Sequence, residues 1–409
     1  MSDRMPESSA AETSFSQLEI DFIKAHMQDD VSQLMLRAGQ FKGYDIKKLA
    51  AQIQSRQKAV KKLPQWSANP ALTFPPALSV EQSSSEGTAR YKASIVSGNQ
   101  LIDITGGMGV DCFYMSQKFE QVQYFEQQAE VAATAKANFK HLGVTNIVVH
   151  AENSLENLAI NNLPADWIYA DPARRNANRE KVVLLSGCTP DIVSNLDLLF
   201  QNAPQILLKT SPLLDIDLAA KSLKYLKEVH VIGFESECKE LLFVMDLNHA
   251  SNDFEIKIRI VDGAGAVLHR MDFNRETERI SQVTYSDPLQ YLYEPHAAVL
   301  KAGAFKTVSA AFSLDKLSIN SQLYTSHALN RDFPGRTFEI IAVCKPDIKE
   351  IAKHIQGDKA NLTVRNFPAK SEELRKKWKL KDGGKYYLFA TTLADNSKVV
   401  VVTMKPEMA

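Results

Sequence analysis

The chain has 409 residues, which is too long for one ordinary hydrophobic core, so we expect two or three domains. With 44% hydrophobic and 23% charged residues, and with no apolar run long enough to cross a bilayer, its composition is that of a soluble globular protein. The four cysteines have neither C-x-x-C spacing nor paired histidines nearby, which argues against a zinc site and a disulfide framework and favours a reducing cytoplasm.

The formal net charge is zero, but charge is unevenly distributed along the chain. Residues 41–92 contain nine Lys and Arg against three Asp and Glu, residues 345–409 contain fourteen against eight, and residues 93–344 contain 22 against 30. Two basic flanks around an acidic middle favour a polyanionic partner such as RNA, since phosphate contacts supply the sequence-independent part of such binding. The alternative is that the lysine-rich helices are only solvated faces.

The N-terminal region, residues 1–92, is predicted to be a tail followed by a helical domain. Its first sixteen residues are polar and acidic, so we expect a short disordered tail that is neither a signal peptide nor a transit peptide. Apolar residues recur at helical spacing from residue 15 to about 63, which predicts two or three amphipathic helices. The prolines of residues 64–76 predict an extended connector, and Ser83 with Glu86 is a capping-box pattern that predicts a helix start.

A glycine-rich loop follows the first predicted strand. Residues 101–105 are a short, mostly apolar strand that leads directly into Gly106, Gly107 and Gly109. Glycines let a ligand approach the main chain, and the helix that follows presents unpaired N–H groups. A second apolar strand ends at Glu126, 20 residues after Gly106, where an acid is placed to accept hydrogen bonds from ribose hydroxyls. The pattern predicts a nucleotide-cofactor site.

The sequence Asp103-x-Thr105-Gly-Gly-x-Gly109 resembles motif I of the class I S-adenosylmethionine (SAM)-dependent methyltransferases. Glu126 stands where that family has its ribose-binding acid. The resemblance implies SAM as the cofactor, with Asp103 facing the ammonium side of its methionine portion and the loop from Thr105 to Gly109 accommodating that portion. A glycine turn without a ligand is the alternative.

Strands and helices alternate from residue 101 to about 246, which predicts a parallel, doubly wound sheet with helices on both faces. The predicted strands lie near residues 101–105, 121–126, 146–151, 166–171, 205–210, 229–235 and 240–246. The last two are too close for a crossover helix and must form an antiparallel hairpin, similar to the one that closes the methyltransferase sheet. We therefore expect a Rossmann-like α/β fold with a seven-stranded sheet in a methyltransferase domain of residues 93–286. Its last part, around Asp262-Gly263, is predicted to be a further β-hairpin.

The fourth predicted strand ends in Asp171-Pro-Ala173-Arg174, which resembles motif IV of the methyltransferases. In members that methylate amino groups, an Asp or Asn followed by two prolines and an aromatic residue accepts hydrogen bonds from the target NH₂. This chain departs from that pattern at Ala173 and Arg174. The resemblance implies that Asp171 orients the acceptor. The loss of the aromatic residue leaves a flipped base without its stacking partner, unless Arg174 itself stacks on the base. The alternative for Asp171 is a helix N-cap.

Two more residues end strands of the predicted sheet at the ligand-binding edge. Lys209 ends strand five and is expected to point toward the cleft, where it pairs with Asp171, holds a phosphate or forms only a structural ion pair. After strand three, Asn153 stands where the family usually has an aspartate that contacts the adenine amino group, with Glu152 as the competing residue. Before the first strand, Ser84, Thr88 and Lys92 are expected to lie on one helical face, either close to the cofactor or packed against the sheet.

Cys188 offers a different chemistry. The sequence Ser186-Gly-Cys188-Thr-Pro190 loosely resembles the Cys-Asn-Pro loop of the uracil-5 methyltransferases, which implies a thiolate that adds to a pyrimidine ring. The sequence shows no neighbouring base that lowers the pKa of the thiol. An inert, partly buried cysteine is therefore the favoured interpretation.

Beyond Asp287 the pattern changes to α+β. We expect a helix-loop segment over 289–305, a basic helix over 371–380, and strands at 337–344, 385–392 and 398–403. The sequences Tyr291–Phe305, Phe333–Arg336 and Asn366–Pro368 resemble bacterial methyltransferases that carry a small ferredoxin-like module followed by a THUMP-like domain. The resemblance implies a ferredoxin-like module at 287–334 and a THUMP-like domain at 335–409.

These patterns together predict a cytoplasmic, SAM-dependent methyltransferase that acts on RNA, most readily on a base amino nitrogen. The outer modules would hold the RNA while the central domain transfers the methyl group, and no metal or membrane is expected to take part. A protein or small-molecule methyltransferase is the second interpretation. A non-catalytic RNA-binding protein that retains the SAM fold is the third.

Overall fold

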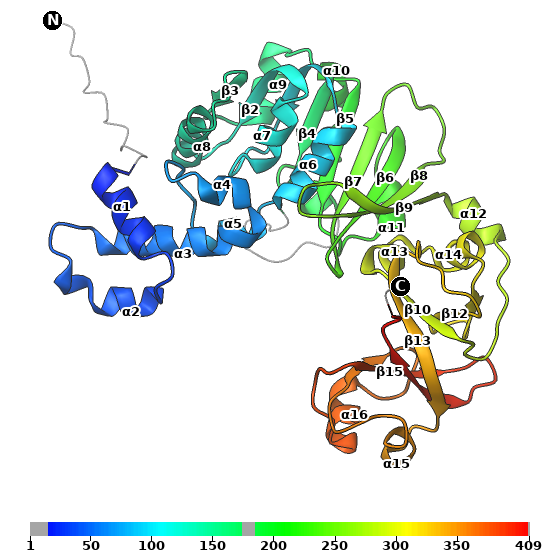
Figure 1. The fold of residues 1–409 in the computed structure, drawn as a ribbon. Helices are drawn as coiled ribbons and strands as arrows, with labels where there is room; N and C mark the ends of the chain where they lie inside the picture. The colour runs from blue at the N-terminus through cyan, green and yellow to red at the C-terminus, as the bar shows by residue number, and fades with distance from the viewer. Residues whose placement is uncertain (1–14, 174–184, 408–409) are drawn as a thin grey trace, which may run out of the picture. The chain divides into compact units, whose positions relative to one another are not determined.

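The computed structural model describes residues 15–173 and 185–407 (Figure 1). The predicted N-terminal tail lies largely outside these residues, and so does Arg174. The chain divides into two compact units that interleave in sequence. The first comprises Met1–Lys227, Leu242–Asn252 and Val261–Ala266, and the second comprises Glu228–Leu241, Asp253–Ile260 and Val267–Ala409.

The N-terminal part of the first unit is helical, as its apolar spacing predicts. Its helices are α1 (Gln17–Ala25), α2 (Val31–Leu36), the short 3₁₀ helix η1 (Ala38–Gln40) and α3 (Ile46–Lys62). They enclose a small core of Phe22, Ile23, Leu34, Ile46, Leu49, Ala50 and Ile53. The amphipathic stripes therefore pack against one another, so this region has a hydrophobic core of its own.

The predicted extended connector is partly wrong, because α4 (Pro64–Ala68) lies within it. Pro64 occupies the first position of this helix, where a residue without an N–H loses no hydrogen bond. A further short helix, α5 (Ala77–Gln82), follows.

The predicted capping box at Ser83 is also wrong. Helix α6 (Glu86–Ile95) begins two residues later, with Ser85 as its N-cap accepting from the Thr88 N–H. Glu86 is buried and instead accepts hydrogen bonds from the backbone N–H groups of Gln65 and Trp66, at 2.6 and 3.1 Å. The acid thus ties α6 to α4, a long-range contact that the local pattern does not reveal.

The larger sheet has nine strands in the order β3-β2-β1-β4-β5-β7-β6-β8-β9. The strands are β1 (Gly98–Asp103), β2 (Phe119–Phe125), β3 (Ile147–His150), β4 (Trp167–Ala170), β5 (Gln205–Thr210), β6 (Leu226–Phe234), β7 (Glu237–Asp246), β8 (Glu255–Val261) and β9 (Val267–Phe273). The first seven are the predicted ones, and β1 to β5 pair in parallel. The predicted hairpin around Asp262 extends the same sheet by two strands.

Helices connect the parallel strands, as their order along the chain requires. They are α7 (Val110–Ser116), α8 (Ala129–His141), α9 (Ser154–Asn161), α10 (Leu196–Asn202) and α11 (Ile216–Ala220). Asp103 at the end of β1 lies opposite Tyr124 of β2 and Tyr169 of β4 in the sheet register. The carboxyl ends of these strands therefore share one edge, which is where an open α/β sheet binds its ligand.

The second unit contains a seven-stranded sheet in the order β11-β12-β10-β13-β16-β15-β14. Its strands are β10 (Tyr291–Pro295), β11 (Asp315–Lys316), β12 (Tyr324–Ser326), β13 (Gly335–Cys344), β14 (Asn361–Val364), β15 (Tyr386–Thr392) and β16 (Lys398–Met404). Its helices are α12 (Arg275–Ile280), α13 (Ala297–Ala302), α14 (Phe305–Phe312), α15 (Ile348–Ile351) and α16 (Ser371–Trp378). The predicted basic helix and the three predicted strands are confirmed.

The predicted helix-loop segment over 289–305 is wrong in its first part, because residues 291–295 form β10. This strand lies between β12 and β13 and pairs with both. Aromatic residues favour strands, but the pairing partners come 30 or more residues later, so local spacing does not reveal them. The helical part is confirmed in α13, where His296 accepts from the Ala298 N–H at 3.0 Å.

Gly335 is required where β13 begins. A Cβ at this position would lie 2.2 Å from the carbonyl oxygen of Glu294 and 2.6 Å from the ring of Phe333. Phe333 is buried against Tyr293, with 5.0 Å between ring centroids. The glycine lets β13 approach β10 closely at this point.

We therefore predict that Gly335→Ala lowers the free energy of unfolding by about 1–3 kcal/mol, the usual cost of overpacking. Urea denaturation measures the change. Gly263→Ala is the matched control, since a Cβ at Gly263 meets nothing within 4 Å. Equal effects of the two substitutions would contradict the steric explanation.

Candidate active site

The glycine loop and the end of β2 form one hydrogen-bonded assembly. The Thr105 N–H donates to Asp103 Oδ1 at 3.0 Å, and the Gly106 N–H donates to the carbonyl oxygen of Phe125 at 2.9 Å. The Gly107 N–H donates to Glu126 Oε2 at 2.9 Å. The structure thus brings together the residues that the motif I resemblance assigns to the cofactor.

The three glycines of the loop are needed for different physical reasons. A Cβ on Gly106 would lie 2.5 Å from the Tyr124 ring, and one on Gly109 would lie 2.5 Å from the Phe139 ring. A Cβ on Gly107 would meet only the carbonyl oxygen of Thr105, at 3.8 Å. Gly107 has φ +66° and therefore combines a left-handed backbone with open space. Packing against these rings requires glycine at positions 106 and 109. Of the three glycines, only Gly107 leaves room for a ligand.

Asp103 is a buried acid at the centre of this loop. Burial, above all, raises the pKa of Asp103 from 3.8 to about 8. The hydrogen bond from the Thr105 N–H opposes this rise, whereas the negative charges of Asp111 and Asp171 add to it. A carboxyl group in this position gains from a nearby cation, because a positive charge favours its ionised form.

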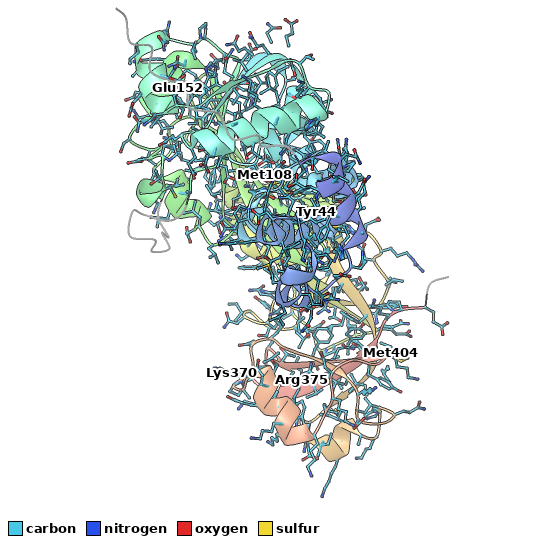
Figure 2. The ribbon with its side chains drawn as sticks, turned by 90° about the vertical axis from the view of Figure 1, so that its left-hand side faces the viewer. Tyr44, Met108, Glu152, Lys370, Arg375 and Met404 are labelled. Carbon is cyan, nitrogen blue, oxygen red and sulfur yellow. The ribbon has the colours of Figure 1, made fainter. Side chains whose placement is uncertain are left out.

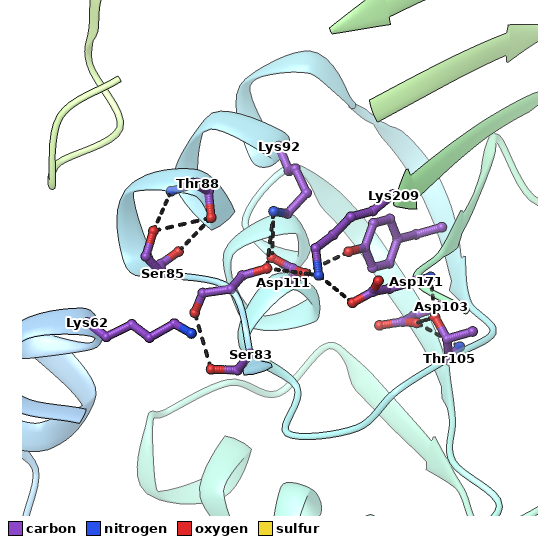
Figure 3. A network of polar contacts seen from close by, with 12 residues as sticks. Lys62, Ser83, Ser85, Thr88, Lys92, Asp103, Thr105, Asp111, Asp171 and Lys209 are labelled. Atoms are coloured by element: carbon purple, nitrogen blue, oxygen red, sulfur yellow. Dashed lines mark hydrogen bonds and ion pairs between the residues drawn. The ribbon is translucent and has the colours of Figure 1, made fainter. Parts of the chain in front are cut away.

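Asp111, in the first turn of α7, is the centre of a buried polar network (Figure 3). Its Oδ2 accepts from Ser84 Oγ at 2.7 Å and from the Tyr169 hydroxyl at 2.6 Å. Its Oδ1 lies 3.2 Å from Lys92 Nζ, and the Lys92 side chain is fully buried. Burial alone raises the pKa of Asp111, but the charges of Lys92 and Lys209 and the two hydroxyl hydrogen bonds outweigh it and hold the pKa below its ordinary value.

Lys209 connects this network to the end of β4. Its ammonium forms an ion pair with Asp171 Oδ2 and lies 3.9 Å from Asp111 Oδ2. The Asp171 N–H donates to Thr105 Oγ1 at 2.7 Å, which attaches the motif IV residue to the glycine loop. Only 10% of the Lys209 side chain is exposed, against 38% for Asp171. The Asp171 carboxylate is therefore held by a buried lysine and remains partly open to solvent.

Sequence reasoning did not assign a role to Asp111. The available signals were its place directly after the glycine loop and the predicted helical face of Ser84, Thr88 and Lys92, of which Ser84 in fact precedes α6. Neither signal shows that α6 and α7 meet, which is what brings the lysine to the acid.

The other predicted site residues lie at the same edge or outside the described chain. Asn153 caps α9, and its Oδ1 accepts from the N–H groups of Leu155 and Glu156 at 3.0 and 3.4 Å. Its contact with adenine stays a prediction. Glu152 accepts from Asn157 Nδ2 at 3.1 Å, and the predicted role of Arg174 lies outside the described residues.

Cys188 lies next to motif IV in space. Ala173 and Thr189 form an antiparallel bridge, with N–H to O distances of 2.8 and 3.0 Å. The Cys188 N–H donates to the carbonyl oxygen of Leu185 at 3.1 Å, and the residue is partly buried. The bridge places the cysteine one residue from the backbone that pairs with Ala173.

Within residues 15–173 and 185–407, no three His, Cys, Asp or Glu side chains gather in a way that could hold a metal ion. In the same part of the chain, no helix has the length and apolarity needed to span a membrane.

A candidate methyltransferase from Porphyromonas gingivalis W83 has a similar crystal structure. The two share 33% sequence identity with a TM-score of 0.83, and the match covers 96% of this chain and 100% of that protein. A ferredoxin-like domain model matches residues 291–334, and a THUMP domain-like model matches residues 335–405. This chain belongs to the family of methyltransferases with a THUMP-like domain.

Other solved structures resemble only part of this chain, and more weakly. An rRNA methylase from Streptococcus thermophilus covers 39% of this chain and 93% of its own, with 9% identity and a TM-score of 0.29. A candidate methyltransferase from Streptococcus mutans in complex with SAH covers 39% and 94%, with 9% identity and the same TM-score of 0.29. No curated protein matches the chain.

The raised pKa of Asp103 leads to a prediction about stability. Between pH of about 4 and 8, folded Asp103 binds a proton that the unfolded chain has released, so the contribution of this residue to stability falls as the pH rises. Asp103→Asn keeps an acceptor for the Thr105 N–H and does not titrate. From pH of about 5 to 8, we expect the wild type to lose at least about 1 kcal/mol of unfolding free energy relative to Asp103→Asn, since one pKa unit corresponds to about 1.4 kcal/mol. Urea denaturation at both pH values measures this, and parallel pH profiles would rule the effect out.

Proposed function

We propose that this protein is a SAM-dependent methyltransferase that modifies RNA, most readily at an exocyclic amino group of a base. The observation that carries the proposal is the part-exposed carboxylate of Asp171, which Lys209 and Thr105 fix beside the glycine loop. A fixed acceptor at the end of β4 suits the orientation of an NH₂ group.

The residues of the loop fit the cofactor. Asp103 is a buried acid that gains from the ammonium group of a methionine portion, and Gly107 leaves space where that portion approaches the main chain. Glu126 already accepts N–H groups of Gly107 and Gln128, at 2.9 and 2.8 Å, so its carboxylate is held at the end of β2 for ribose hydroxyls. When bound, SAM supplies a methyl group on an electrophilic sulfonium.

The protein's part in the reaction is mainly positioning. Asp171 Oδ2 accepts from Lys209, which leaves Oδ1 to accept an N–H of the target amine. Such a hydrogen bond directs the nitrogen lone pair toward the methyl group. Because methyl transfer to nitrogen is an in-line displacement, alignment of the reactants contributes more than a strong base does.

RNA is favoured as the substrate by the charge of the C-terminal region and by the THUMP domain-like match at 335–405. The last turn of helix α16 contributes three cations, namely Arg375 (labelled in Figure 2), which is partly exposed and pairs with Asp382, and Lys376 and Lys377, which are exposed. Exposed cations of this kind contact phosphates. Proteins and small molecules are the alternative substrates.

Gly107→Asn tests the cofactor site. Asparagine tolerates the left-handed backbone of this position, so the fold is retained while the side chain fills the open space. We expect SAM affinity to fall about tenfold or more by calorimetry, because more than about 1.4 kcal/mol of contact is lost. Gly143→Asn is the matched control, since Gly143 has φ +75° and nothing within 4 Å of its Cβ position. Unchanged binding by folded Gly107→Asn would remove SAM from this loop.

Asp171→Ala tests the acceptor site. We expect it to retain SAM and to lose methyl transfer to RNA about a hundredfold or more, as is usual when a group that acts in the transition state is removed. Asp171→Asn should be milder, because an amide oxygen still accepts a hydrogen bond. The assay incubates the protein and labelled SAM with total bacterial RNA, before and after ribonuclease treatment. Label that survives ribonuclease in a protein fraction would move the activity to a protein substrate.

Cys188→Ala is the control for a covalent mechanism, since the cysteine lies close to motif IV. The proposal expects activity near that of the wild type. Loss of activity in Cys188→Ala together with full activity in Asp171→Ala would instead indicate addition to a pyrimidine ring. That mechanism leaves a carbon-methylated pyrimidine, which mass spectrometry separates from a methylated amine.

A further inference from the structure

Three sequence stretches of the second unit meet at one ionic cluster that methyl transfer does not use. The cluster consists of Glu294 from β10, Arg336 from β13 and Arg365, which follows β14. Arg336 Nε donates to Glu294 Oε2 at 2.8 Å, with a second bond from Nη2, and Arg365 Nη2 donates to Glu294 Oε1 at 2.9 Å. The carboxylate is 5% exposed, whereas Arg336 and Arg365 are 51% and 39% exposed.

The backbone around Arg336 fixes it in place. Glu294 and Arg336 lie directly opposite each other in the β10–β13 register. Gly335 permits the close approach of the two strands, as described above. The Arg336 guanidinium also lies over the Phe338 ring, 5.5 Å from its centroid. This arginine therefore has little conformational freedom to lose when it binds a ligand.

Arg365 is fixed by the turn that follows it. Asn366 has φ +51°, and its Nδ2 donates to Ser318 Oγ at 3.1 Å. The Thr392 hydroxyl donates to the Asn366 carbonyl oxygen at 2.6 Å. The turn thus joins the THUMP-like match to residue 318 of the ferredoxin-like match, and both arginines are held over one carboxylate.

The charges of this cluster do not cancel. One arginine neutralises Glu294, and the second leaves a net positive charge on two half-exposed guanidinium groups. Among the residues that the structure describes, neither arginine uses its Nη1 in a hydrogen bond. A guanidinium fork matches the oxygens of a phosphate group and binds it through two parallel hydrogen bonds. A pair that served only to neutralise the buried acid would need one arginine.

We propose that Arg336 and Arg365 together bind one backbone phosphate of the RNA substrate, with Glu294 as the residue that positions them. This site rests on the proposed function, since it places part of the RNA on the second unit. It contributes affinity and register, and no base specificity, because a phosphate carries no sequence information.

The test measures filter binding of labelled total bacterial RNA at several salt concentrations. Arg336→Gln and Arg365→Gln should each weaken binding several-fold and reduce the salt-dependence slope by about 1, as the loss of one phosphate contact does. Arg336→Lys and Arg365→Lys should weaken binding as well, since they keep the charge and lose the fork. Arg279→Gln is the matched control, because Arg279 pairs with Glu276 on α12 and both side chains are exposed. SAM affinity, measured by calorimetry, should stay at the wild-type value in every folded variant.

The outcomes separate this site from the proposed function. Wild-type methylation of RNA together with unchanged binding in both glutamine variants would overturn the phosphate site alone. Full binding by the lysine variants would also overturn it, because diffuse charge would then suffice. A wild-type protein that neither binds nor methylates RNA would overturn both. If a glutamine variant unfolds early in a thermal melt, the lysine variant at the same position decides.

Discussion

The buried carboxylate of Asp111 is the constraint on which the active-site edge depends. An ionised group away from water is costly unless it is paired and hydrogen-bonded. Lys92 from α6, Lys209 from β5 and the Tyr169 hydroxyl from β4 supply this compensation. One acid thereby holds two helices and two strands together. Because Lys209 also pairs with Asp171, the same constraint fixes the carboxylate that we propose to orient the methyl acceptor.

Asp103 differs from Asp111 although both acids are buried in one site. Two lysines lie beside Asp111 and favour its ionised form. Asp103 accepts a backbone N–H, but two neighbouring negative charges disfavour its ionised form. Asp103 therefore holds a proton directly beside the glycine loop, and a cation bound there would favour its ionised form. The two acids thus have opposite pKa shifts because their neighbours differ in charge.

Much of the fold could be predicted from local patterns in the sequence. The glycine loop, the seven alternating strands and the place of Lys209 at a strand end all follow from spacing along the chain. Contacts between distant segments could not be predicted. The partner of Glu86 is a backbone 20 or more residues away, β10 is a strand because of pairings formed later in the chain, and Asp111 meets Lys92 only because α6 packs on α7. Local propensity carries no information on such packing.

Asp111 in the first unit and Glu294 in the second are buried carboxylates that each gather two cations, and exposure distinguishes the roles of these cations. Around Asp111, Lys92 is fully buried and Lys209 is 10% exposed, so both lysines serve to compensate charge within the protein. Around Glu294, Arg336 and Arg365 keep about half and two fifths of their surface in solvent. Lysine suits the first setting as a compact point charge, and arginine suits the second, since its planar fork can bind an acid on one edge and a phosphate on the other. The residue types thus follow the two settings: the lysines compensate Asp111, with Lys209 also holding the Asp171 carboxylate that we propose to orient the methyl acceptor, and the arginines remain able to hold a substrate.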